Sequence, residues 1–390
     1  MNLLVATDHF YPDIMGGSGR VAAELSSLLA RKGHAVTIIT RRWNPAHPEF
    51  EARDGMTVYR YTADATTPFR LIRSVRNAVE LATRAAFPMS PPDAVHVHQP
   101  LSGAGLLPFI ARRKVPVTYF FYSPWRLEYF LGRQAHEALS LPGFLHDQLR
   151  RSMERTLIRR AEKIVTLSRF SEEQLRREFR VRDQRVIVSG IGVNLTRFRP
   201  ACEGEDSRAA LGLPADRRIL FTVRNLLPDM GVEDLLGAVA RFRAEDPSLL
   251  LLIAGAGPLE PELRARADAS DLAGAVRFLG FVDDARLPDY YRACDLFVLP
   301  NSQREGFGLV ITEALACGTP AIGTPAGAIP EILHALDPRL LCASTGPESL
   351  YATMHNFFRL GIPRAEWSRR CRAYAESRFT WETLARDITT

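Results

Sequence analysis

Two carboxylates eight residues apart, Glu305 and Glu313, are the side chains of this chain best suited to ligand chemistry. Gly306 and Gly308 stand between them after a strongly apolar run, and the pattern predicts a helix that carries Glu313 about two turns in. Carboxylates accept hydrogen bonds from sugar or ribose hydroxyls, and the amides of a helix N-terminus suit a phosphate. The segment therefore indicates a site for sugar hydroxyls and a phosphate. In the alternative interpretation, Glu305 is only a charge at the helix start and Glu313 is a solvated side chain.

Two further glycine turns lie where an apolar run meets a helical pattern. One contains Gly16 and Gly17, and the other contains Gly255 and Gly257. Glycines let a ligand approach the backbone closely, and amides at a helix start suit an anion. Neither turn matches the dinucleotide fingerprint G-x-G-x-x-G, so each is either a ligand contact or a plain structural turn.

Short apolar runs alternate with helical patterns along the chain, and the alternation restarts after about residue 200. This pattern predicts an α/β protein with two doubly wound, Rossmann-like domains. We expect the first domain at residues 1–197 and the second at 208–370, with a polar linker between them. A helix at 371–390 should pack back on the first domain. Because ligands of such folds bind at the carboxyl ends of the strands, we expect the motifs in a cleft that the two domains face.

The composition excludes several classes of protein. The chain has 390 residues and a net charge of +6, and its five cysteines show no CxxC spacing, so we expect no metal. The positive charge suits an anionic nucleotide, but no basic run interleaved with aromatic residues indicates nucleic-acid binding. No apolar run reaches the roughly 18–20 residues that span a bilayer, so we expect a cytoplasmic protein without membrane association. The basic helix at 148–163 is either a solvated face or a contact for anionic lipid.

The order of these motifs resembles that of glycosyltransferase family 4, a family of retaining glycosyltransferases with the GT-B fold. Its E-x7-E signature matches Glu305 to Glu313. Further matches follow in the family's order along nearly the whole chain, at residues 10–19, 33–37, 93–98, 161–168, 190–198 and 379–382. The resemblance implies a GT-B fold, with two Rossmann-like domains facing a cleft, and a nucleoside-diphosphate-sugar as co-substrate, in the UDP or GDP form.

The resemblance also implies a role for each matching residue. Glu305 would contact the donor sugar, Glu313 the ribose, and Arg224 the charge of the diphosphate leaving group. The remaining donor contacts would come from loops and backbone amides, namely those of Gly16, Gly17, Phe281, Val282, Gly306, Phe307, Gly308, Leu309 and Val310. Such enzymes are similar in needing no metal and no cofactor, because an arginine and helix dipoles take the charge that a magnesium ion would otherwise balance.

The chain departs from the family pattern at two positions. Met230 stands where the family has a lysine that would pair with the diphosphate, and Arg304 is our candidate for its replacement. Tyr122 stands where the family has a histidine near the donor sugar and acceptor. A tyrosine is a poor base, with a pKa near ~10, but its hydroxyl can bond a sugar or acceptor; alternatively it is a packed aromatic.

We expect an acceptor pocket around Tyr122. The other residues that would line it are His98, Ser123, Trp125 and Glu128. His96 and His98 alternate along a predicted strand and should share a face. They could form a metal pair, but no third ligand is nearby, so we favour structural or acceptor-side roles.

The sequence therefore predicts a retaining, metal-independent glycosyltransferase that acts on a small-molecule acceptor, for example in natural-product or thiol biosynthesis. Its catalytic residues would be Glu305, Arg224 and Tyr122. One alternative is a catalytically impaired GT-B-fold partner that binds nucleotide; another is a lipid or polysaccharide glycosyltransferase. A pyridoxal-dependent phosphorylase is disfavoured, because none of the three lysines lies in the second domain. The sequence does not define the oligomeric state.

Overall fold

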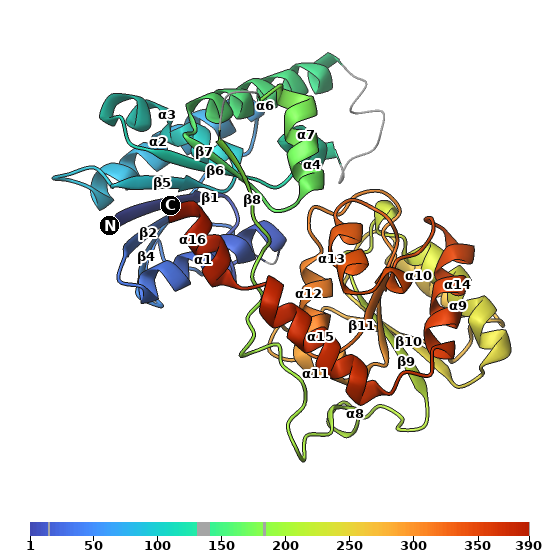
Figure 1. Cartoon of the computed structure of the whole chain (residues 1–390). Helices are drawn as coiled ribbons and strands as arrows, with labels where there is room; N and C mark the ends of the chain where they lie inside the picture. Colours follow the sequence, from blue (N-terminus) through green and yellow to red (C-terminus); the bar gives the residue numbers. More distant parts are fainter. Residues whose placement is uncertain (15, 131–140, 182–184, 390) are drawn as a thin grey trace. The chain divides into compact units, whose positions relative to one another are not determined.

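The computed structural model describes residues 1–14, 16–130, 141–181 and 185–389, and of these the side chains at 68, 128–130, 141–145, 185 and 389 are left undescribed. Contacts divide the chain into two compact units. The first unit comprises Met1–Gly190 with Trp381–Thr390, and the second comprises Ile191–Thr380. Each unit is an α/β structure built on one sheet (Figure 1).

The sheet of the first unit has eight strands in the order β3-β4-β2-β1-β5-β6-β7-β8. The strands are β1 (Asn2–Thr7), β2 (Ala35–Arg41), β3 (Phe50–Arg53), β4 (Met56–Tyr61), β5 (Ala94–Val97), β6 (Val117–Phe121), β7 (Lys163–Thr166) and β8 (Arg185–Val188). All pairings are parallel except β3 with β4. The central strands are buried on both faces, which explains their continuous apolar runs.

Helices cover this sheet and connect its parallel strands. They are α1 (Gly17–Arg31), α2 (Pro68–Ala86), α3 (Pro100–Arg113), α4 (Trp125–Phe130), α6 (Leu141–Arg160), α7 (Arg169–Phe179) and, from the chain end, α16 (Trp381–Thr389). The last helix, α16, packs against α1 (Figure 1). The Nζ of Lys163 donates to the carbonyl of Ile388 at 3.1 Å, and Ser189 Oγ donates to the carboxylate of Asp387 at 2.9 Å.

The sheet of the second unit has five parallel strands in the order β11-β10-β9-β12-β13. They are β9 (Arg218–Val223), β10 (Leu249–Ala254), β11 (Val276–Gly280), β12 (Leu296–Leu299) and β13 (Ala321–Gly323). The helical segments are α8 (Ser207–Ala210), η1 (Pro228–Met230), α9 (Val232–Glu245), α10 (Glu260–Ala267), α11 (Leu287–Ala293), α12 (Leu309–Ala316), α13 (Ile329–Leu336), η2 (Pro338–Leu340), α14 (Pro347–Arg359) and α15 (Arg364–Arg378). Edge-to-face contacts among Phe221, Tyr291 and Phe297 lie in its core.

The units divide at other residues than the sequence predicted. Residues 191–198 belong to the second unit, because Arg372 of α15 donates to the carbonyls of Leu195 and Phe198 and the amide of Val193 donates to Phe379. The helical tail expected at 371–390 is also split. Helix α15 packs against α12 of the second unit, and only α16 packs on the first.

None of the helices in the described parts of the chain combines the length and the apolarity that a bilayer crossing requires.

Candidate functional site

Four loops at the carboxyl edge of the second sheet approach one another at backbone contact distance. The positions of three glycines show this. A Cβ on Gly231 would lie 1.8 Å from the carbonyl oxygen of Pro300, and one on Gly255 would lie 1.8 Å from that of Arg224. A Cβ on Gly327 would lie 2.2 Å from the carbonyl oxygen of Glu305. All three glycines have positive φ, so side chains are excluded here by both space and backbone conformation. The glycines therefore let the loops after β9, β10, β12 and β13 form one continuous surface.

Glu305 and Arg224 form an ion pair on this surface. Arg224 follows β9 and Glu305 follows β12, and Arg224 Nη1 lies 3.0 Å from Glu305 Oε2. Both side chains are mostly buried, at 11% and 16% exposure. The other terminal nitrogen of Arg224, Nη2, lies 2.7 Å from the sulfur of Met230. Two predicted site residues and the position of the missing lysine thus come together in one cluster.

Asn301 holds Glu305 in place and was not predicted from the sequence. Its side chain is fully buried, and its Nδ2 donates to the carbonyl of Arg304 at 2.8 Å and to Glu305 Oε2 at 3.3 Å. The backbone carbonyl of Asn301 accepts from the hydroxyl of Thr324. The one available signal in the sequence was a polar residue two positions after a fully apolar strand.

The N-terminus of α12 lies directly after Glu305. Gly308 is the N-cap and has φ +97°, a conformation that favours glycine. The amides of the first helical turn have no acceptor within the helix, so those of Leu309 and Val310 are suited to an anion. Phe307 is buried and packs edge-to-face on Phe379 of the same unit, which anchors the loop.

Glu313 lies only one turn into α12, not two as predicted, because the helix begins at Leu309. It is also not a solvated side chain, since it is 1% exposed. Its Oε2 accepts a hydrogen bond of 2.9 Å from the hydroxyl of Tyr291, which is itself fully buried in α11. Tyr291 is therefore a second residue that the sequence analysis missed.

Three further predicted donor contacts lie on loops of the same unit. Phe281, directly after β11, is 64% exposed, and Val282 is half-buried. The Arg304 side chain is half-buried and makes no ion pair or side-chain hydrogen bond with the residues that the structure describes. Its guanidinium can therefore take an anionic partner, whereas that of Arg224 already pairs with Glu305.

In the first unit, the loop after β1 is fixed by charged and polar side chains. Asp13 forms an ion pair with Arg60 Nε at 2.5 Å, and both side chains are nearly inaccessible to solvent. Gln99 accepts from the amide of Asp8 at 2.8 Å and donates to Ser18 Oγ at 2.9 Å. Gly16 and Gly17, at the start of α1, are exposed, so this loop presents open backbone at a helix N-terminus.

Asp8 is a buried acid at the carboxyl end of β1. Its carboxylate accepts from the hydroxyl of Tyr61 at 3.0 Å, and the indole nitrogen of Trp43 donates to its carbonyl at 2.6 Å. Burial raises the pKa of Asp8 to about 6, although Tyr61 and Arg41 counter part of the effect. The nearby buried Tyr61 has a pKa well above its ordinary value, mainly because of burial and then the charge of Asp8.

His98 and Tyr122, both predicted on the acceptor side, are in direct contact. His98 Nδ1 lies 2.6 Å from the Tyr122 hydroxyl, and the His98 ring stacks on Phe120 at 4.1 Å. His96 also contacts Phe120, which confirms that the two histidines share a face. Burial lowers the pKa of His98 well below 6.5 and that of His96 to about 4, so both rings are neutral near pH 7. With His98 neutral, the Nδ1–Tyr122 contact is a hydrogen bond and carries no net charge.

The remaining predicted acceptor residues follow β6. The amide of Trp125 donates to Glu154 Oε2 at 3.0 Å, and Tyr119 donates to Glu154 Oε1 at 2.9 Å. The fully buried Glu154 thus joins β6, α4 and α6 and was not singled out from the sequence. Ser123 is half-buried, and the side chain of Glu128 lies outside the described residues. Within the described part of the chain, no three His, Cys, Asp or Glu side chains gather closely enough to hold a metal ion.

Two family models match the chain in succession. The one described as "Glycosyltransferase Family 4" matches residues 15–197, and the one described as "Glycosyl transferases group 1" matches residues 203–377. The chain is similar to "D-inositol 3-phosphate glycosyltransferase 2" of Catenulispora acidiphila. The two are 30% identical over 333 residues, which cover 80% of this chain and 75% of that protein.

Solved structures of similar fold cover the whole chain. Sucrose-phosphate synthase of Thermosynechococcus elongatus matches with a TM-score of 0.81 and 24% identity, over 100% of this chain and 97% of that one. HepE of Anabaena, in complex with UDP, matches with a TM-score of 0.77 and 18% identity, over 100% and 98% of the two chains. HepE has also been solved in complex with UDP-glucose.

Proposed function

The chain belongs to the glycosyl transferases group 1 and has the GT-B fold, and from this premise we propose that it moves a sugar from a nucleoside-diphosphate-sugar to a small-molecule acceptor with retention of anomeric configuration. The observation that carries the proposal is the Arg224–Glu305 ion pair beside the N-terminus of α12. It combines an anion-binding group, a carboxylate for sugar hydroxyls and free helix amides on one surface.

In this proposal the sugar, the diphosphate and the ribose of the donor all have partners at the carboxyl edge of the second sheet. Glu305 accepts from sugar hydroxyls through Oε1, which makes no hydrogen bond within the described residues. Arg224 and the amides of Leu309 and Val310 take the charge of the diphosphate. Glu313, oriented by Tyr291, accepts from the ribose.

Other donor contacts are backbone amides and loop side chains. The amides of Gly306, Phe307 and Gly308 hold sugar hydroxyls, and Phe281 with Val282 borders the nucleobase. Phe281 is 64% exposed, which suits offset stacking of its ring on a base. Gly16 and Gly17 border the diphosphate and acceptor.

The reaction proceeds by front-face departure of the nucleoside diphosphate. The bond between the anomeric carbon and the phosphate oxygen breaks, and the acceptor oxygen bonds to the same face of the oxocarbenium-like sugar. The proton of the acceptor passes to the leaving phosphate oxygen. Catalysis then rests on charge stabilisation at the leaving group and on acceptor position, and no metal or covalent intermediate takes part.

Tyr122 and His98 serve the acceptor half of the site. A neutral His98 fixes the Tyr122 hydroxyl at 2.6 Å, so that this hydroxyl orients an acceptor group. A tyrosine hydroxyl donates and accepts hydrogen bonds, and in this proposal Tyr122 acts as a hydrogen-bonding group and not as a base.

The first donor to test is a UDP-sugar, since HepE, of similar fold, has been solved with UDP and UDP-glucose. A GDP-sugar is the second. For the acceptor, the C. acidiphila relative is named for D-inositol 3-phosphate, which supports a small hydroxylated acceptor over a polymer. A cytoplasmic location stays a prediction.

The proposal is tested by a donor and acceptor screen with purified protein. UDP- and GDP-sugars are incubated with pooled small acceptors in the presence of EDTA, and nucleoside diphosphate release is followed with the wild type and with Glu305→Gln. We expect release with one nucleotide, and NMR of the product should show the anomeric configuration of the donor. An inverted product, or turnover that EDTA abolishes, would contradict the mechanism.

A second candidate is a nucleotide-binding partner without catalysis. The Met230 sulfur in contact with Arg224, where the family has a lysine, favours it, because a thioether cannot neutralise a diphosphate. Specific binding of UDP or GDP without turnover of any donor would support this candidate over the enzyme.

A further inference from the structure

A cavity of about 190 Å³ lies in the first unit, at the amino edge of its sheet. Its floor is formed by residues at the starts of β1, β5, β6 and β7. Helices α1 and α16, which pack on each other, cover it with Leu29 and Ile388. The predicted acceptor residues His98 and Tyr122 follow the other ends of β5 and β6, so the cavity is not part of the site proposed above.

Three polar side chains stand side by side on the floor of the cavity. His96 on β5 is in register with Thr118 on β6, and Thr118 is in register with Lys163 on β7. Register partners of parallel strands point to the same face of a sheet, and neighbouring strands are only about 4.8 Å apart. All three side chains line the cavity. They form a polar row that one small ligand can contact.

His96 and Thr118 have hydrogen-bonding capacity left for such a ligand. His96 is 5% exposed, and its Nδ1 has no partner in the described part of the chain. Burial and then the charge of Lys163 lower the pKa of His96 to about 4, so near pH 7 its neutral ring carries one N–H that can donate. The buried Thr118 makes no side-chain hydrogen bond to any described residue.

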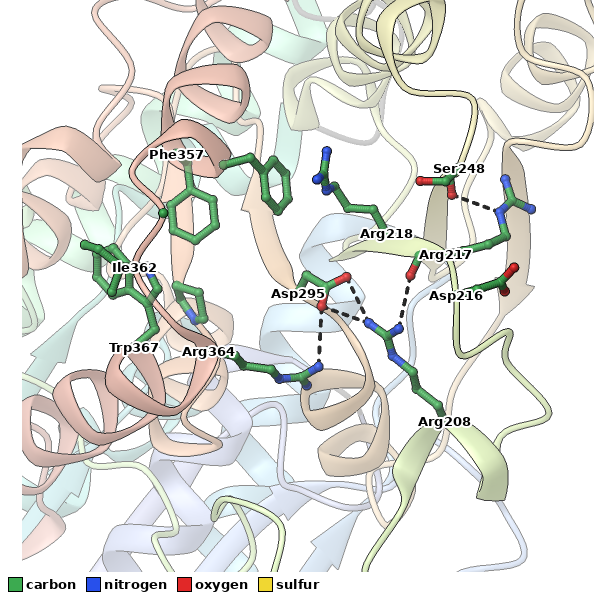
Figure 2. A pocket seen from close by; sticks show the side chains of 13 residues that line it. Arg208, Asp216, Arg217, Arg218, Ser248, Asp295, Phe357, Ile362, Arg364 and Trp367 are labelled. Carbon is green, nitrogen blue, oxygen red and sulfur yellow. Dashed lines mark hydrogen bonds and ion pairs between the residues drawn. The ribbon is translucent and has the colours of Figure 1, made fainter.

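Lys163 adds a cation with free donors to the polar row. Its Nζ donates to the carbonyl of Ile388 at 3.1 Å, and it forms no ion pair among the residues that the structure describes. An ammonium group has three N–H donors, so two of them remain. The cavity of the second unit in Figure 2 differs, because its Arg208 and Arg364 already pair with the carboxylate of Asp295.

Above the polar row, the cavity has an apolar wall. Leu3, Leu29 and Ile388 form it, and all three are buried. An apolar cavity of roughly 150 Å³ is large enough to bind benzene. The cavity of about 190 Å³ therefore has room for an apolar body of that size and a small polar head group.

The rim of the cavity carries negative charge. The exposed Asp93 and Glu162 stand there, and Asp93 Oδ2 already accepts from the amide of Asn2 at 2.7 Å. His34 also lines the cavity and is half-buried. The two carboxylates repel an anion in proportion to its charge, so they disfavour a phosphate dianion more than a ligand with a single negative charge.

We propose that this cavity binds a small monocarboxylate whose apolar body is about the size of a benzene ring, with the carboxylate on the polar row and the body against the apolar wall. A carboxylate only accepts hydrogen bonds, and its two oxygens have sites for the donors of all three side chains in the row. The charge of Lys163 favours it over a neutral amide of the same shape. The proposal does not depend on the proposed donor site or on the reaction.

The test compares two carboxylates with matched probes. Benzoate and isovalerate are the carboxylates, benzamide and isovaleramide are their neutral controls, and phenyl phosphate is the dianion. Calorimetry on the full chain measures binding to the wild type, Lys163→Gln and Arg73→Gln. Lys163→Gln removes the charge but keeps an N–H donor. Arg73→Gln is the control, since it removes an exposed charge on α2, which packs on the other face of the sheet.

We expect at least one carboxylate to bind the wild type and Arg73→Gln equally. Lys163→Gln should bind it about tenfold more weakly or worse, the effect of losing a hydrogen bond to a charged group. The amides and phenyl phosphate should bind the wild type more weakly than the carboxylates by a similar factor.

Three outcomes would overturn the proposal. One is that neither carboxylate binds the wild type at millimolar concentration. Another is that Lys163→Gln and Arg73→Gln bind equally, since the anion would then lie elsewhere, for example at the start of α12. The third is that the amides or phenyl phosphate bind as tightly as the carboxylates. If Lys163→Gln fails to fold, Thr118→Val replaces it, and this loss of one hydroxyl should weaken binding about fivefold.

Discussion

At the scale of single residues, Glu305 is placed by three neighbours. Arg224 and Asn301 both contact its Oε2, and the amide of Ala328 donates to its carbonyl at 2.8 Å. Its other carboxylate oxygen makes no hydrogen bond within the described residues, so we expect it to be available to a ligand. A side chain fixed in this way orients substrate without paying for its own ordering when the substrate binds.

Glu305→Gln should lower kcat about 100- to 1000-fold, the effect of losing one well-placed group that stabilises the transition state. Nucleoside diphosphate affinity should be retained or increased, because Arg224 would no longer be shared with a carboxylate. Both quantities are measured on one preparation, by steady-state kinetics and calorimetry. The control is Glu262→Gln, at an exposed position of α10, which should change neither. Full activity of Glu305→Gln would refute the donor-site assignment.

The hydroxyl of Tyr122 contacts His98 within the first unit. Tyr122→Phe should lower kcat/KM about tenfold and the free energy of unfolding by only about 1 kcal/mol, the value of one hydrogen bond. Activity assays and chemical denaturation measure the two effects. Tyr59→Phe is the matched control, because Tyr59 packs on Phe50 at the sheet edge, away from His98. An unchanged rate would assign Tyr122 to packing alone.

At the scale of elements, the donor-site surface depends on how closely loops approach one another. The loop after β13 reaches the loop after β12 only because Gly327 has no side chain. Similar contacts at Gly231 and Gly255 bring in the loops after β9 and β10. The strands fix the starting point of each loop, and the glycines allow the final approach.

Gly327→Ala should therefore lower the free energy of unfolding by more than the strain of a positive φ alone would. Gly212 has a similar φ, +61° against +59°, but a Cβ there would meet nothing within 4 Å. Gly212→Ala should lower the free energy of unfolding by about 1–2 kcal/mol and leave activity unchanged. Gly327→Ala should lower it by more and also reduce activity, since the backbone of Glu305 must move. Equal effects of the two substitutions in denaturation and activity assays would contradict this account.

At the scale of the whole molecule, stability should respond to pH through the buried Asp8. Its pKa is about 6 in the folded chain against 3.8 ordinarily, so the folded state holds this proton more tightly than the unfolded state. The stability contributed by the protonated form is complete below about pH 4 and is lost as pH rises through about 6. His96 acts in the opposite direction, because its lowered pKa disfavours folding as pH falls below its ordinary value of 6.5.

Asp8→Asn should remove the contribution of Asp8. Relative to wild type, its free energy of unfolding should rise by about 2–3 kcal/mol between pH 4 and pH 7.5. Urea denaturation at both pH values measures this, and the difference between the two proteins cancels the other titrating groups. Asp268→Asn, at an exposed position, should show no such change. A constant difference between Asp8→Asn and wild type would show that folding does not raise the pKa of Asp8.

The fold and the family could both be predicted from the amino-acid sequence. Alternating apolar runs, glycine turns and the spacing of Glu305 and Glu313 are local patterns, and local patterns specify strands, helix starts and motif order. The GT-B fold and the family resemblance were confirmed on that basis. The roles of the donor and acceptor residues stay predictions.

The side chains that meet across the fold could be identified from the folded chain alone. Arg224 and Glu305 are 81 positions apart in the sequence, and Tyr291 and Glu313 are 22 positions apart. Neither contact could be predicted from a local sequence pattern. The unit boundary at Gly190 and the split between α15 and α16 likewise follow from packing and not from composition. The carboxylate of Asp295 shows the same limit, since it pairs with Arg208 and with Arg364, which lie in distant segments of the chain. Periodicity encodes which face of an element is buried, but the partners on that face are fixed only when the chain folds.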